Sequence, residues 1–133
     1  MIYFIRDGEF PNTSIKIGLT CGNAEARKDA LQTGNPRPLC VAWQISGDGE
    51  TERLLHEFFK KYNIRGEWFN ESGDFSVRFY YLTELARNIY RLAGDDEIVF
   101  IKLLNKCLSE FDNESAVGFF GKRFQKELSA YYA

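Results

Sequence analysis

The sequence predicts a mixed α/β (α+β) fold, in which a small three-stranded antiparallel sheet flanked by helices precedes a helical C-terminal region. Up to about residue 74, runs rich in β-branched and aromatic residues alternate with helix-like stretches. Beyond residue 75, apolar residues recur only at helical spacing. With 133 residues and a hydrophobic share of 44%, the chain can build a core. We therefore expect a domain over residues 1–74 and a three-helix extension over 75–133, packed on it or used for partner binding.

In the first part, the pattern predicts three strands and two helices. The strands are expected at residues 2–5, 15–19 and 39–45, the third largely buried, and a short extended piece at 67–69. The first helix is expected between Asn23, a suitable N-cap, and the stop signal Gly34-Asn35-Pro36. The second helix is expected over residues 49–62.

In the second part, Gly94 ends one expected helix, Asp95 or Asp96 caps the next, and Ser115 caps a third. This region is rich in aromatic residues, which are Phe79, Tyr80, Tyr81, Phe119, Phe120, Phe124, Tyr131 and Tyr132. Packing against the sheet is the preferred explanation. A homodimer interface or a protein partner bound by the C-terminal helices is the alternative.

The composition limits the classes of function. The formal net charge is −2, and residues 1–74 hold 9 Lys and Arg against 11 Asp and Glu. Nucleic-acid binding would therefore need a local basic cluster. Cys21, Cys40 and Cys107 are widely spaced without a C-x-x-C pair, which argues against a zinc site or disulfides and indicates reduced thiols in the cytoplasm. No apolar run reaches membrane-spanning length, so no membrane partner is expected.

Four polar residues are candidates for chemistry. Lys16 and Gly18 alternate with the apolar residues of the second strand and so point to the other face. Lys16 is then either a cation beside the open space at Gly18 or an ordinary surface lysine. Arg27 shares a helix face with apolar residues and needs an anion, which is a carboxylate such as Glu67 or a bound phosphate.

Glu52 and His56 lie one turn apart at the border of the apolar face of the second helix. A carboxylate there suits Mg²⁺, which often takes only one or two protein carboxylates. The histidine, the only one in the chain, suits proton transfer. The competing interpretation is a Glu–His pair on a helix edge.

Five segments in this order resemble the GIY-YIG nuclease superfamily, in its phage and bacterial subgroup with a Lys-Ile-Gly second motif and a Gly-Glu-Trp-Phe ending. They span roughly residues 1–70. The segments are Ile2-Tyr3-Phe4-Ile5, Ile15-Lys16-Ile17-Gly18-Leu19-Thr20, Arg27 with Leu31-Gln32-Thr33-Gly34-Asn35-Pro36, Glu52-x-x-x-His56, and Gly66-Glu67-Trp68-Phe69.

The resemblance implies a role for each matching residue. Tyr3 would be the general base or water-orienting hydroxyl, and Lys16, at the second-motif tyrosine, would stabilise a neighbouring phenolate or hydroxide. Gly18 would leave room in the sheet, and Arg27 would hold the scissile phosphate. Glu52 would bind Mg²⁺ or Mn²⁺.

The remaining motif positions depart from the family or lie beside the site. Leu31 occupies a position where many relatives carry His or Tyr, and we hypothesise that His56 supplies the imidazole instead. The residues expected close to the substrate are Gly18, Glu67, Trp68 and Asn70, with Asn70 or Asn63 at the family asparagine.

The leading interpretation is a metal-dependent endonuclease that hydrolyses nucleic acid phosphodiesters, DNA foremost, with a single divalent ion. The alternative is a catalytically inactive module on the same fold that binds nucleic acid or a protein partner. The acidic charge balance and Leu31 motivate this alternative.

Overall fold

The computed structural model describes residues 1–8 and 13–111 and has a mixed α+β fold. Its five strands form one antiparallel sheet in the order β3-β1-β2-β5-β4. The strands are β1 (Ile2–Asp7), β2 (Ser14–Leu19), β3 (Leu39–Ile45), β4 (Asn63–Arg65) and β5 (Trp68–Asn70). The helices of the described part are α1 (Ala24–Gln32), α2 (Gly49–Phe58), α3 (Gly73–Ala93) and α4 (Glu97–Ser109), with a 3₁₀ turn, η1 (Lys60–Tyr62).

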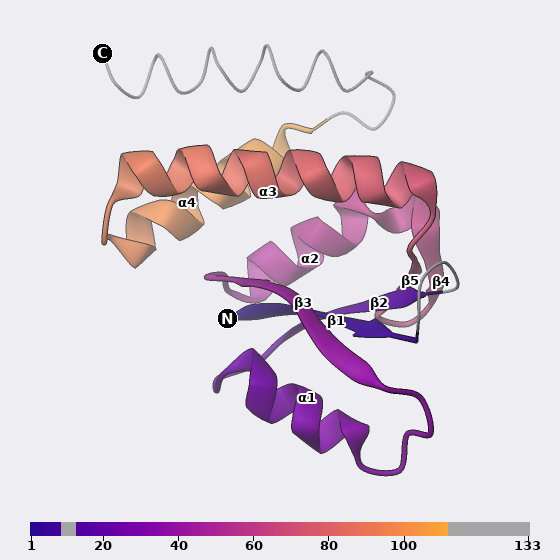
Figure 1. Cartoon of the computed structure of the whole chain (residues 1–133). Coiled ribbons are helices and arrows are strands. Elements are labelled where there is room, and N and C mark those ends of the chain that lie inside the picture. Colours follow the sequence, from indigo (N-terminus) through magenta and orange to yellow (C-terminus); the bar gives the residue numbers. More distant parts are fainter. Residues whose placement is uncertain (9–12, 112–133) are drawn as a thin grey trace.

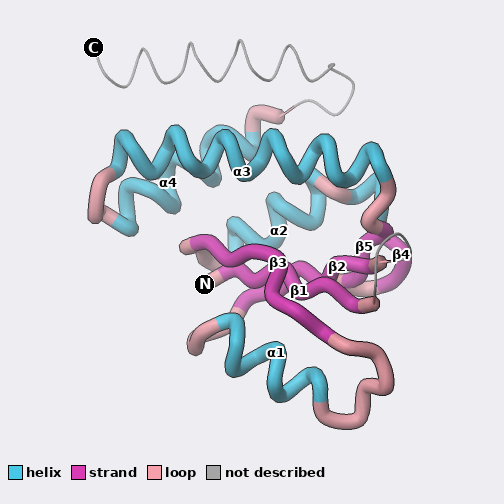
Figure 2. The backbone as a smooth tube through the Cα atoms, viewed as in Figure 1, coloured by secondary structure: helices cyan, strands magenta, loops and turns pink. Residues whose placement is uncertain are grey.

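The sheet lies between two layers of helices (Figure 1). Helix α1 covers one face, where it packs on β3 and β1. Helix α2 packs on β2 from the opposite face, and α4 packs on both α2 and α3. Figure 2 shows the same arrangement by secondary structure, with α1 alone on its side of the sheet. The two faces therefore differ in how much of the sheet the described helices cover.

Side-chain caps fix where the helices begin. Asn23 accepts a hydrogen bond from the Ala26 backbone N–H and starts α1, as the sequence predicts. Asp48 starts α2 with a capping box in which the backbone N–H of Thr51 donates to the Asp48 carboxylate and the Asp48 N–H donates to the Thr51 hydroxyl. Asn105 of α4 donates to the same carboxylate, so this cap also anchors α4.

The prediction of three strands was wrong in number, because the sheet has five. The extended piece near residue 68 is β5, and β4 pairs with it in a hairpin whose turn contains Gly66 at φ +54°. Strand β4 has three exposed residues and directly follows η1, so its pattern shows no alternation. Strand β3 has the predicted bounds but lies at the sheet edge with exposed Cys40 and Gln44, so it is not largely buried.

One hydrophobic cluster joins the sheet to α2, α3 and α4 and so continues across residue 74. Phe79 of α3 stacks edge-on against Phe4 of β1 and Trp43 of β3, as expected of a packing residue. Tyr80, in contrast, is 60% exposed. The predicted third helix and its aromatic residues, from Ser115 onward, lie outside the described residues.

Within residues 1–8 and 13–111, no helix has both the length and the apolar character needed to cross a membrane.

Candidate active site

The site is built on the sheet face that carries α1. In the β1–β2 register Tyr3 lies directly opposite Gly18. A Cβ atom at Gly18 would lie 2.2 Å from the Tyr3 hydroxyl oxygen and 2.4 Å from Cζ, so the absence of a side chain makes room for the phenol. Tyr3 is 2% exposed and packs with Ile5 and Ala24. The phenol is therefore fixed in position, with its hydroxyl over Gly18.

Helix α1 places Arg27 over this hydroxyl. The Asn23 cap fixes the start of α1, and Ala24 and Leu31 pack on the sheet cluster around Tyr3. Arg27 lies one turn after Ala24 and is exposed. A hydrogen bond to the Tyr3 hydroxyl, with smaller electrostatic contributions from Tyr3 and Glu67, raises the pKa of Arg27 above its ordinary value. The guanidinium therefore lies near the Tyr3 hydroxyl, and its N–H groups can bind a ligand.

Lys16 extends the site along β2. Its Nζ lies 2.9 Å from a carboxylate oxygen of Glu67 and 5.5 Å from the centroid of the Trp68 ring. The Glu67 carbonyl also accepts a hydrogen bond from the Ile17 N–H, which fixes the hairpin turn against β2. The sequence left Glu67 as a possible partner of Arg27, but its ion pair is with Lys16.

Helix α2 approaches β2 from the other face. His56 Nε2 lies 2.9 Å from the Ile17 carbonyl oxygen, and the imidazole packs edge-on against Phe69. A carbonyl only accepts, so Nε2 carries the proton and Nδ1 is the nitrogen left for another partner. Half-buried Glu52 lies one turn earlier on α2, and among the described residues no side chain forms an ion pair or hydrogen bond with its carboxylate.

The structure therefore brings Tyr3 and Arg27 together and joins Lys16 to Glu67 and Trp68, on β1, β2, β5 and α1. His56 reaches the middle of β2 at its backbone, and Glu52 follows the same side of α2.

The two candidate asparagines lie farther from Tyr3. Asn70 pairs with Ser14, at the opposite end of β2 from Gly18. Asn63 donates to the carbonyls of Gly66 and Trp68 and so stabilises the β4–β5 hairpin.

A divalent ion would have to bind here with few protein ligands. In the described part of the chain, no group of three or more His, Cys, Asp or Glu side chains is positioned to hold a metal. Glu52 fits Mg²⁺ or Mn²⁺ as a single carboxylate, because these ions fill their octahedron with water and phosphate oxygens. It does not fit an ion that demands an all-protein cage.

One residue close to the site in the sheet was missed from the sequence. Arg65 of β4 lies directly opposite Trp68 in the hairpin and is exposed. The signal that could have found it is the spacing Asn63-x-x-Gly66, which suits a hairpin turn and places Arg65 across from the residues after the glycine.

A family model described as the T5orf172 domain matches residues 1–90, which is more than half of the 133 residues. The match covers every candidate site residue and most of α3. No curated protein and no solved structure gives a significant match.

Proposed function

The chain belongs to the T5orf172 domain family, and we propose that it is a metal-dependent endonuclease that hydrolyses phosphodiester bonds of nucleic acid, DNA foremost. The observation that carries the proposal is the pairing of exposed Arg27 with the buried Tyr3 hydroxyl above Gly18, beside a second cation, Lys16. The order of motifs, which resembles GIY-YIG nucleases, supports the same reaction.

Arg27 and Lys16 are the groups proposed to bind the scissile phosphate. A guanidinium binds two phosphate oxygens at once, and Arg27 lies near the Tyr3 hydroxyl. Charge that develops on the phosphate during attack is then met by donors already in place. In the free protein Lys16 forms an ion pair with the Glu67 carboxylate. When a phosphate binds, it would replace that carboxylate as the anionic partner of Lys16.

Tyr3 and His56 are proposed to act on the attacking water. The Tyr3 hydroxyl lies near Arg27 and can donate or accept a hydrogen bond, which suits it to orient a water beside the phosphate. His56 keeps Nδ1 available while Nε2–H donates to Ile17, so its imidazole is positioned to accept a proton at Nδ1.

Glu52 is the proposed metal ligand. A Mg²⁺ or Mn²⁺ bound there would neutralise charge on phosphate oxygens and stabilise the leaving oxygen. The contribution of the chain is a half-buried carboxylate for which the described residues provide no other partner.

The test is cleavage of end-labelled DNA and RNA with Mg²⁺ or Mn²⁺. We expect nicking by the wild type and a loss of at least about 100-fold in Glu52→Gln and Arg27→Ala, the range for removing one preorganised charge. Matched controls are Glu57→Gln on the exposed side of α2 and Lys28→Ala on the outer side of α1, which should cleave normally. Folded wild-type protein that cuts no substrate with either ion would contradict the proposal.

The second candidate function is a non-catalytic module that binds nucleic acid on the same face. The ion pair of Lys16 with Glu67 and the bond that holds His56 on the Ile17 carbonyl favour it, because both are structural uses of residues assigned to chemistry. Salt-dependent binding that requires Arg27, without turnover, would identify this function.

A further inference from the structure

Two cationic residues, Lys16 and Arg65, pair with Trp68 at the end of the sheet. Trp68 of β5 lies directly opposite Lys16 of β2 on one side and Arg65 of β4 on the other. In the regular β2–β5 register, directly opposite residues project from the same face, and Lys16 Nζ lies 5.5 Å from the Trp68 centroid. On the other side the β4–β5 register is irregular between Asn63 and Arg65, and it brings the backbone of exposed Arg65 opposite Trp68.

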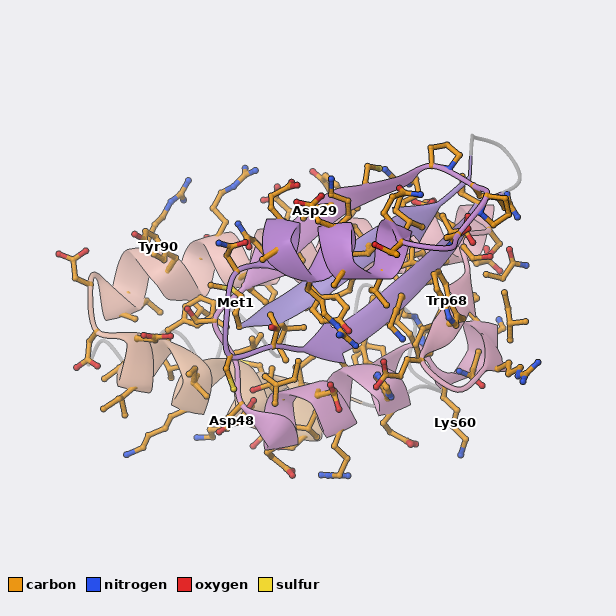
Figure 3. All side chains as sticks on the ribbon, turned by 90° about the horizontal axis from the view of Figure 1, so that it is seen from below. Met1, Asp29, Asp48, Lys60, Trp68 and Tyr90 are labelled. Carbon is orange, nitrogen blue, oxygen red and sulfur yellow. The ribbon has the colours of Figure 1, made fainter. Side chains whose placement is uncertain are left out.

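This part of the face is not covered by the described helices. Helix α1 makes its main contacts with β3 and β1, at the other side of the sheet. Figure 3, viewed from the α1 side, shows Trp68 beside α1 rather than beneath it. Arg65 and its neighbour Ile64, which is 57% exposed, belong to the adjacent strand β4, and exposed Lys60 and Lys61 precede β4.

The Trp68 ring is not used for core packing in the described structure. The hydrophobic cluster on the α2 side of the sheet includes its neighbour Phe69, and the cluster on the α1 side gathers around Tyr3 and Ile5. Trp68 belongs to neither cluster. A half-exposed indole outside both clusters, with the Lys16 ammonium beside its ring and Arg65 on the adjacent strand, offers a flat apolar surface close to positive charge.

On the basis of the proposed function, we propose that Trp68 is a stacking platform for an unpaired base, so that the substrate is single-stranded nucleic acid. An aromatic face binds the π-face of any base, whereas flanking cations follow the sugar-phosphate backbone. In a duplex the base faces are occupied by their neighbours, so only an unpaired or unstacked base can use the ring. The local cations supply what the overall charge of −2 lacks.

The geometry connects this platform to the site. Lys16 and Gly18 are two residues apart on β2, a rise of about 7 Å, and Gly18 lies under the Tyr3 hydroxyl that holds Arg27. A base on Trp68 and a phosphate at Arg27 would thus belong to neighbouring nucleotides of one strand. The platform would set which linkage reaches the site, without reading base identity.

The test is fluorescence anisotropy with labelled oligothymidylate, oligouridylate and a duplex of equal length, in EDTA so that no cleavage occurs. We expect the single strands to bind more tightly than the duplex. Trp68→Ala should weaken single-strand binding at least about fivefold, the lower end for loss of one base stack. Trp68→Phe should restore most of it, because it keeps an aromatic face.

Two further variants separate stacking from general effects. Arg65→Gln should reduce the slope of log Kd against log salt by about 0.7, the loss of one phosphate contact on a single strand. Tyr90→Ala, which removes a 62% exposed aromatic ring of α3, should bind as the wild type does. Equal affinity for duplex and single strands, or wild-type binding by well-folded Trp68→Ala, would overturn the inference.

The outcomes also separate this inference from the proposed function. Cleavage of DNA that does not depend on Trp68 would leave the nuclease standing and refute the platform. Single-strand binding that depends on Trp68, with no cleavage under any divalent ion, would support the platform and refute the nuclease. The oligothymidylate and oligouridylate arms identify whether the platform prefers DNA or RNA, and a single-strand preference in either supports it.

Discussion

Replacing Gly18 with alanine tests the contact on which the site depends. The new Cβ would lie 2.2 Å from the Tyr3 hydroxyl oxygen, where real Cβ contacts below 3.0 Å essentially never occur. The ring must therefore retreat by about 1 Å to restore an ordinary contact, yet Tyr3 is 2% exposed and packed in the core. Overpacking of this kind costs about 1–3 kcal/mol. The same displacement moves the hydroxyl away from Arg27, so activity should fall as well.

Urea denaturation followed by circular dichroism measures the first effect. With an m-value of about 2 kcal/mol/M, a loss of about 2 kcal/mol lowers the midpoint by about 1 M. Gly73→Ala is the matched control, because a Cβ at this first residue of α3 would meet nothing within 4 Å. Its midpoint should stay the same or rise slightly, since alanine favours the helix.

The reasoning is refuted if Gly18→Ala is as stable as Gly73→Ala. That result would mean that the Tyr3 ring does not lie over Gly18. A stable Gly18→Ala that also keeps full activity would remove the basis for assigning Tyr3 to Arg27.

Three other perturbations have defined outcomes. Burial raises the pKa of Glu71, but hydrogen bonds, chiefly from Arg6, outweigh burial and lower this pKa below its ordinary value of 4.5. The stability that the ionised carboxylate contributes is therefore present above pH 4.5 and is lost as the pH falls through the lower folded pKa. In urea titrations, Glu71→Gln should therefore lose less stability than the wild type between pH 5 and pH 3. Asp48→Ala should lower the unfolding free energy by about 1–2 kcal/mol, because it removes the α2 cap and the hydrogen bond from Asn105. Asp48→Asn, which can still cap the helix, should cost much less, and equal losses in the two variants would argue against capping. His56→Ala should slow cleavage, and an unaltered rate in a folded variant would reject its role in proton transfer.

The sequence predicts the local features of this fold well. Asn23 caps α1 and β3 has its predicted bounds, because capping and strand propensity depend on adjacent residues. Gly18 was expected to leave room, and the structure adds which side chain fills it, the Tyr3 phenol. That pairing depends on the register between two strands, which no local pattern contains.

The features that the sequence missed depend on contacts between distant segments. Strand β4 has three exposed residues, too few to show alternation, so only the hairpin spacing Asn63-x-x-Gly66 indicates Arg65. The bond from His56 to the Ile17 carbonyl arises because β5 pairs only with the first part of β2. The free backbone carbonyl beyond that pairing becomes a partner for a side chain of α2.

The most direct test of the central claim is paramagnetic line broadening by Mn²⁺ in the ¹⁵N-labelled chain. The account predicts that substoichiometric Mn²⁺ broadens the amide signals of Glu52 and of Gly18 together, and that Glu52→Gln abolishes both effects. Broadening confined to another acidic stretch, such as Asp95, Asp96 and Glu97, and unchanged in Glu52→Gln would contradict a metal site at Glu52.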